Sequence, residues 1–329
     1  MRSERRHASR RPKGVKRRPV PRVDSRKKTL GQALFEAMAQ EQRRVLSDWR
    51  ALLFIRRATQ ELPLSERRWA KAPESLEDIR AILTRLVRNG ELTHAPSASF
   101  LYEVNAPFAR SGVLDEDEVL MEVQPFAALS HLTALYFHQL TEEFPQEAHM
   151  VLPSSKEGGL RPPGVSEEEW VTGRLSILGH QPDRIAGRPV YWHRLAYAPA
   201  ELGTAEYRPR SYPVRVTIPE RTVLDGLMHP EWCGGLQNVL KAWVASRDTL
   251  DVPTVVELVD SMDKALLRQR AGFVLESLGL THPDLDSWAA TSKRGGSSRL
   301  AGAEPFSREY SERWNLSLNA STDVLREGL

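Results

Sequence analysis

The chain has 329 residues, of which 40% are hydrophobic and 27% charged, a balance typical of a folded protein, and this length favours two domains with tails over one core. Its single cysteine, Cys233, excludes a disulfide framework and a thiolate zinc centre within the chain. No apolar run approaches the roughly 20 residues that cross a bilayer, and the basic start lacks the apolar segment of a secretory signal, so we expect a cytoplasmic protein without a membrane partner.

The net charge of +3 is unevenly distributed along the chain. Residues 1–28 hold thirteen Lys and Arg, including Arg17 and Arg18, against two acids, so this segment carries +11 and the rest of the chain −8. Arg and Pro dominate residues 2–22 with few apolar side chains between them, so this arm cannot fold alone. We interpret it as an arm that follows nucleic-acid phosphates or enters a groove. The alternative is that this segment is only a solubilising tail, or that it results from translation at an upstream start codon.

Helical patterns follow the arm. Apolar spacing predicts one or two helices over Leu30–Arg57 and a short helix over Ser65–Lys71. Ser75-Leu-Glu-Asp78 has the form of a capping box, in which the Ser oxygen and the acid satisfy free amides. It predicts a helix that runs to about Arg88 and ends at Asn89-Gly90.

Two short strands are predicted next, Leu92–His94 and Phe100–Asn105, joined by the flexible tip Ala95–Ser99. Helices followed by a two-stranded hairpin are typical of a winged helix-turn-helix domain. We assign that domain to residues 29–110.

The helix of residues 75–88 separates into two faces. An apolar stripe would face inward, and the opposite face carries small residues between arginines, which can approach guanine edges and phosphates. The candidate DNA-binding residues are therefore Ser75, Glu77, Arg80, Ala81, Thr84, Arg85 and Arg88 on the helix, Ser97 and Ser99 on the hairpin tip, and Arg17 and Arg18 on the arm. The alternative is a solvated surface helix. Residues 61–94 hold six basic and six acidic side chains, so the arm would have to supply much of the attraction to DNA.

A second domain is predicted over residues 122–286, after an acidic hinge at Asp115–Glu118. The expected elements are a helix over Phe126–Gln139, a small sheet from His149–Leu152, Val190–Ala196 and Val214–Thr217, and a helix over Trp170–Leu178. Residues 287–329 form a flexible segment and tail, because Ser287–Glu304 is rich in Gly and Ser. The expected fold class is thus α+β, with a winged helix in front of a mixed α/β domain and C-terminal helices.

Several local signals agree between Tyr212 and Leu280. Pro219 occupies a first helical position after the predicted strand, and His229-Pro230 ends that helix. Gly234-Gly235 opens a second helix, and a third starts near Pro253. A fourth ends at Leu278-Gly279 with a left-handed cap.

The amino-acid sequence of this region resembles that of the AbiEi family of bacterial antitoxins and transcriptional regulators of type IV toxin–antitoxin systems. The matching segments are Ile218-Pro-Glu-Arg-Thr-Val-Leu-Asp225, Cys233-Gly-Gly-Leu-Gln-Asn-Val-Leu240 and Arg270-Ala-Gly-Phe-Val-Leu-Glu-Ser-Leu-Gly279, with Ala128–Leu135 and Tyr310–Leu316 on either side. The similarity covers about two-thirds of the chain. It implies a front winged helix that binds double-stranded operator DNA at inverted repeats, and a second domain with the antitoxin function. It also implies a nucleotidyltransferase toxin as functional partner, which antitoxins of this family often counteract without a stable complex, in a phage-defence setting.

No active site emerges from the sequence. Gly295-Gly-Ser297 lacks the paired carboxylates with which such toxins hold metal, and His131 and His138 lack a third ligand. Cys233 is expected to be a small buried residue. Glu220 and Arg221 are explained by a helix start and a pair with Asp225. We therefore predict no catalytic residue, no metal and no cofactor.

The leading hypothesis is a DNA-binding transcriptional autorepressor and antitoxin-like regulator. One alternative is a stand-alone regulator or accessory factor of another defence or mobile-element operon, which the absence of a neighbouring toxin gene would favour. Another is a nucleic-acid-modifying enzyme with the winged helix as a targeting module, which turnover of a labelled nucleotide or RNA would support.

Overall fold

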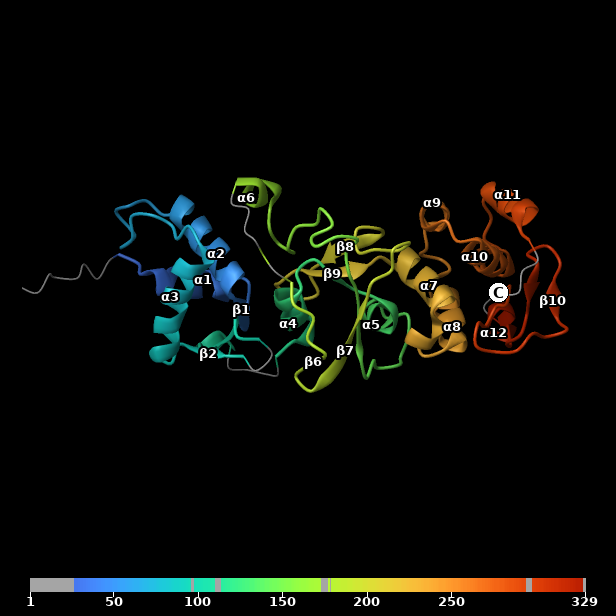
Figure 1. The fold of residues 1–329 in the computed structure, drawn as a ribbon, viewed down its shortest axis with the longest axis horizontal. Helices are drawn as coiled ribbons and strands as arrows, with labels where there is room; N and C mark the ends of the chain where they lie inside the picture. Colours follow the sequence, from blue (N-terminus) through green and yellow to red (C-terminus); the bar gives the residue numbers. More distant parts are fainter. Residues whose placement is uncertain are drawn as a thin grey trace, which may run out of the picture.

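The computed structural model describes residues 27–95, 98–109, 114–172, 177, 179–293 and 298–327. It is a mixed α+β structure, as expected from the sequence. In Figure 1 the chain runs along the long axis of the molecule: the N-terminal helices lie at one end, a sheet in the middle and the C-terminal helices at the other end.

The N-terminal elements combine three helices with a three-stranded antiparallel sheet of order β1-β3-β2. They are α1 (Leu30–Gln40), β1 (Val45–Ser47), α2 (Asp48–Glu61), α3 (Leu76–Arg88), β2 (Leu92–His94) and β3 (Leu101–Val104), followed by the 3-10 helix η1 (Pro107–Ala109). The helix predicted from Ser75 is confirmed as α3, and its capping box joins Ser75 and Asp78.

One expectation for this region was incomplete and another was wrong. The stretch predicted as one or two helices forms the two helices α1 and α2, but it also contains strand β1 between them, whose three buried residues pair with β3. Ser65–Lys71 is not a helix. Its first residues form a turn in which Glu66 N donates a hydrogen bond to Pro63 O at 2.9 Å. A β-bridge then pairs Arg67 with Lys28, which precedes α1.

The acidic segment expected as a hinge is instead the start of a helix, α4 (Glu116–Val123). Asp115 caps it by accepting a hydrogen bond from Asp117 N at 3.1 Å, and acids favour the positive end of a helix. Burial raises the pKa of Asp117 to about 7, and Asp115 adds to the shift. Glu118 and Glu122 on the same helix are buried against the N-terminal elements, so this segment is a packed junction.

The central sheet has six strands in the order β6-β7-β5-β4-β9-β8, with both parallel and antiparallel pairs. They are β4 (Ala128–Leu129), β5 (Ala148–Val151), β6 (Arg184–Ile185), β7 (Arg188–His193), β8 (Thr204–Tyr207) and β9 (Val214–Thr217). The three strands expected from the sequence are confirmed as β5, β7 and β9.

Two predicted helices around this sheet are shorter or displaced. The helix expected over Phe126–Gln139 is confined to α5 (His131–Phe137), because β4 precedes it in the sheet. The helix expected over Trp170–Leu178 begins earlier, as α6 (Glu167–Thr172). Residues 173–176 and 178 lie outside the described residues.

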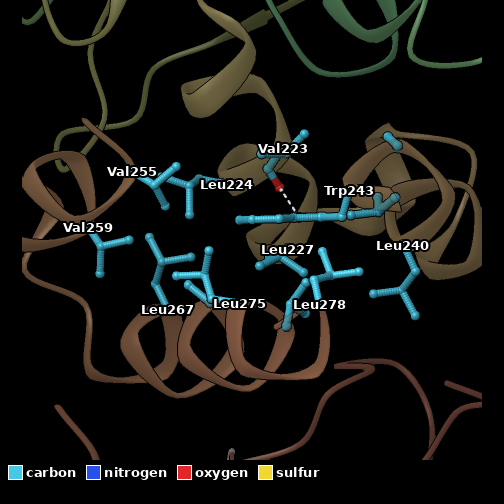
Figure 2. Packing of buried hydrophobic residues seen from close by; sticks show 14 of the residues in the cluster. Val223, Leu224, Leu227, Leu240, Trp243, Val255, Val259, Leu267, Leu275 and Leu278 are labelled. Carbon is cyan, nitrogen blue, oxygen red and sulfur yellow. Dashed lines mark hydrogen bonds between the residues drawn. The ribbon is translucent and has the colours of Figure 1, made fainter. Parts of the chain in front are cut away.

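The C-terminal helices follow the local signals closely. They are α7 (Pro219–Met228), the 3-10 helix η2 (Pro230–Trp232), α8 (Leu236–Ser246), α9 (Val252–Met262) and α10 (Ala265–Ser277). Gly279 has φ +70°, which confirms the left-handed cap after α10. Figure 2 shows their shared core: the fully buried Trp243 lies between these helices and donates its indole N–H to Val223 O at 3.1 Å.

The chain ends with α11 (Asp284–Thr291), the short strands β10 (Tyr310–Ser311) and β11 (Leu316–Ser317), and α12 (Asp323–Glu327). Residues 287–291, expected to be flexible, are therefore helical. Trp314 is fully buried against Gly272 of α10, where a Cβ would lie 2.2 Å from the indole. This part of the predicted tail is packed on the helical core.

Candidate nucleic-acid interface and a histidine cluster

Helix α3 has one buried and one exposed face. Ile79, Leu83 and Leu86 are buried in the N-terminal core. The six candidate residues within the helix are all exposed, namely Glu77, Arg80, Ala81, Thr84, Arg85 and Arg88. The small side chains Ala81 and Thr84 therefore lie on an open surface between arginines, the arrangement that close approach to a groove floor requires.

The three arginines of this face differ in their surroundings. The side chains of Arg85 and Arg88 form no hydrogen bond or ion pair within the described part of the chain. Arg80 is 55% exposed and is bound by Asp48 at the start of α2. Its Nε and Nη2 lie 2.7 and 2.6 Å from Asp48 Oδ2. Sequence reasoning missed Asp48, because the two residues are 32 positions apart.

Hydroxyl groups among the candidates are partly used inside the protein. Ser75 Oγ accepts from Asp78 N at 3.2 Å and donates to Asp78 Oδ2 at 2.9 Å. Thr84 Oγ1 donates to Arg80 O at 2.8 Å, so this hydroxyl proton is occupied. Ser99 is exposed beside the hairpin. Ser97, Arg17 and Arg18 lie outside the described residues.

A buried network of ion pairs and hydrogen bonds stabilises the elements on which α3 packs. Glu122 of α4 is fully buried, and its Oε1 accepts from Arg43 Nη1 and Arg50 Nε, both at 2.9 Å. Its Oε2 accepts from Ser47 Oγ at 2.5 Å, and its main-chain oxygen accepts from Trp49 Nε1 at 3.1 Å. One carboxylate of α4 thus fastens β1 and the first turn of α2, where Asp48 lies.

Far from α3, five aromatic rings stand in a row on one face of the central sheet. The order is Tyr191, His149, His193, Trp232 and His229, with centroid separations of 5.5, 5.2, 4.0 and 3.9 Å. Successive ring planes are within 24° of parallel. The rings come from β5, β7 and the segment around η2, so the row joins the sheet to the C-terminal helices.

His131, at the start of α5, lies beside this row, with its ring plane at 56° to that of His193 and at 79° to that of Trp232. Its ring is fully buried, 4.7 Å from His193 and 5.0 Å from Trp232 between centroids. Nδ1 lies 2.9 Å from Ser130 Oγ, whereas Nε2 is buried and has no hydrogen-bond partner among the residues that the structure describes. The backbone φ of His131 is +51°, a left-handed conformation that is strained for a residue with a side chain.

His131, His149 and His193 are neutral at pH 7. Burial lowers the pKa of His149 and of His193 to about 4, with Arg188 contributing for the first and the neighbouring histidines for the second. Burial, reinforced by the other imidazoles, also holds the pKa of His131 well below its usual value. His149 Nδ1 and His193 Nε2 are 2.9 Å apart, so one donates and the other accepts. Within the described residues, no three His, Cys, Asp or Glu side chains are arranged to hold a metal ion.

Acidification is expected to destabilise this cluster. A histidine whose pKa is lowered by folding contributes stability that is complete above about pH 6.5 and is lost as the pH falls toward 4. For His149 we expect a loss on the order of 3 kcal/mol between these pH values, and His193 adds a similar loss. His149→Asn should remove the contribution of His149, and the measurement is denaturant unfolding at pH 7 and pH 4.5.

The pH dependence must be compared between wild type and variant, because Asp117 and Glu118 change the stability of the folded state in the opposite direction. Burial raises the pKa of each to about 7, so protonation stabilises the folded state as the pH falls. Both are present in wild type and variant, so their contribution cancels in the difference. The exposed His94→Asn serves as control. Equal pH dependence of wild type and His149→Asn would contradict the prediction.

Other residues singled out in the sequence have structural roles. His138 Nε2 lies 2.7 Å from Thr217 O, away from the ring row. Arg221 and Asp225 form a buried pair at 2.8 Å, as expected. Cys233 is buried, and burial raises the pKa of its thiol well above the usual value, so it is unreactive. Gly295–Ser297 lies outside the described residues.

No family model and no curated protein matches the chain. Among solved structures, the fold is similar to that of the RV2827C protein from Mycobacterium tuberculosis, with a TM-score of 0.53 and 14% sequence identity. The match covers 91% of this chain and 94% of that chain. At this level of identity the likeness concerns the fold alone.

Among the described residues, no helix combines the length and apolarity that spanning a membrane demands.

Proposed function

We propose that this protein is a DNA-binding transcriptional regulator that uses its N-terminal elements as a winged helix-turn-helix. In support, the chain order is α1, β1, α2, α3 and then the β2–β3 hairpin, and β1 pairs with β3 to complete a small antiparallel sheet. In this arrangement α3 is the recognition helix, and the tip between β2 and β3 is the wing.

One observation carries the proposal: the outer face of α3 is open over its full length. Its small residues Ala81 and Thr84 are exposed between three arginines, while the inner face is locked into the core. A helix buried on both sides could not enter a major groove. This one can, and its arginines can reach guanine edges and phosphates.

The regulatory role extends the resemblance to AbiEi antitoxins. The protein would repress its own operon by binding inverted repeats, and its second domain would act against a nucleotidyltransferase toxin in phage defence. A neighbouring toxin gene supports this extension; its absence favours a stand-alone regulator.

The test is selection of duplex fragments from a random pool by the purified full-length protein, followed by sequencing. We expect an enriched site with two related halves. Enrichment of no sequence, at salt concentrations where binding occurs, would overturn the proposal.

Arg85 and Arg88 are expected to contact phosphates, because both are exposed and unpaired within the described residues. Arg85→Ala with Arg88→Ala should weaken binding to the selected and to a scrambled duplex alike. The slope of log K against log salt should fall by about 1.8, since each lost phosphate contact removes roughly 0.9. Fluorescence anisotropy between 50 and 200 mM salt, within the range where such losses are large, measures both quantities.

Two exposed arginines at the other end of the molecule provide a charge-matched control, Arg308→Ala with Arg326→Ala. This variant should keep the wild-type slope. Equal losses in the two double variants would mean that only net charge matters.

A further inference from the structure

The guanidinium of Arg80 is held along one edge before any DNA arrives. Nε and Nη2 share that edge, and both bind Oδ2 of Asp48, at 2.7 and 2.6 Å. The other edge carries Nη1 and the second hydrogen of Nη2, and Nη1 bonds to none of the residues described in the structure. This free edge offers two parallel N–H donors, the pattern that binds O6 and N7 of guanine together.

Asp48 is a rigid support. Its side chain is only 4% exposed, and its backbone N–H donates to Phe100 O at 3.0 Å. It occupies the first turn of α2, where the helix dipole favours an anion. The preceding Ser47 is bonded to the buried Glu122 of α4. Asp48 therefore cannot follow Arg80 outward, and Arg80 stays anchored near the base of α3.

The contrast with the other arginines separates two roles. Arg85 and Arg88 have no anchor within the described residues, so their side chains lose rotamer freedom when they bind a partner. Arg80 has already lost that freedom, and a preorganised group binds with less entropic cost. An anchored guanidinium can discriminate between bases, whereas unanchored ones suit phosphates at several positions.

We propose that Asp48 is a positioning residue for base recognition: it fixes Arg80 so that the free edge reads a guanine in the major groove. This inference rests on the DNA-binding function proposed above. It assigns the specific contact to the Asp48–Arg80 pair, one residue of which lies on α2 and not on the recognition helix.

The test compares Asp48→Asn, Arg80→Ala and the double variant on the duplex selected by wild-type protein. The probes also include that duplex with each G·C pair changed in turn. Each single variant should bind the selected duplex about 5- to 150-fold more weakly, the range for one bidentate base contact. Each should lose the preference at the same G·C pair, and the double variant should be no worse than Arg80→Ala.

Arg80→Lys separates reading from charge, because lysine keeps the charge but cannot form the two-pronged contact. It should lose the same base preference. Arg88→Ala is the matched control and should weaken all duplexes without changing any base preference. Melting temperatures of every variant establish that the folded state is retained.

If Asp48 only neutralised the charge of Arg80, the binding result for Asp48→Asn would be the opposite. Asp48→Asn would then bind every duplex more tightly, with wild-type base preferences, and the inference would be overturned while DNA binding stands. Should wild-type protein enrich no sequence, the proposed function fails and this role fails with it.

Discussion

Glu122→Gln is expected to lower the free energy of unfolding by about 3–5 kcal/mol, the range for breaking a buried ion pair from one side. The carboxylate is fully buried and is shared by Arg43 and Arg50, which are themselves buried. Burial, together with the neighbouring Arg43, already lowers the pKa of Arg50 to about 10. Removing the negative charge leaves two buried guanidiniums without the carboxylate that they share, although Arg43 keeps its pair with Glu41 at 2.6 Å. Urea denaturation at pH 7 measures the change.

The same chemical change at an exposed site provides the control. Glu142 is exposed on the loop after α5, and Glu142→Gln should change the unfolding free energy by less than about 0.5 kcal/mol. A Glu122→Gln protein within about 1 kcal/mol of wild type would show that the network tolerates loss of its centre. That result would also weaken the argument that α4 holds the first turn of α2 in place.

The elements that could be predicted from sequence are those whose signals are local. Helix α3 begins with a Ser–Asp capping box and α7 with a proline at its first position, and both were found within a residue of the predicted start. The glycine after α10 adopts the left-handed conformation that its position required. Caps and breakers act over three or four residues, so they can be recognised without knowing the fold.

The missed elements depend on distant partners. β1 and β4 have three and two residues, too few to show an alternating pattern, and they exist because β3, β5 and β9 pair with them. The acidic residues of α4 looked like a solvated hinge, since nothing local reveals that Glu118 and Glu122 face the N-terminal core. A charged residue that is buried by a long-range partner cannot be distinguished in sequence from an exposed one.

The features of the candidate DNA-binding site also divide into those that local sequence signals predict and those that depend on distant residues. The exposed face of α3 follows from helical periodicity and was predicted with its residues. The anchoring of Arg80 by Asp48 was not predicted, and neither was the ring row, whose histidines are contributed by separate elements. Both are products of tertiary packing. The sequence thus predicts which face of α3 is exposed, and the structure adds which of its side chains are fixed by other residues.

Deletion of residues 1–26 is expected to produce the largest loss of DNA affinity. Residues 2–26 carry eleven Lys and Arg against two acids, whereas the remainder of the chain is acidic overall. If six of these charges meet phosphates, the slope of log K against log salt falls by about 5. Binding to every duplex should then weaken by roughly 10³-fold at low salt, because the counterion release that drives association is lost.

The position of the cut decides whether the experiment reports on charge or on folding. Lys27 donates to Leu64 O at 3.3 Å, and Lys28 pairs with Glu36 at 2.7 Å, so both belong to the folded N-terminal elements. A protein that begins at Lys27 keeps these contacts and should retain the wild-type melting temperature. Its base preferences should also persist, because Arg80 and Asp48 are intact. A salt slope equal to that of the full chain would show that the arm makes no phosphate contacts, and the attraction would then have to come from α3 alone.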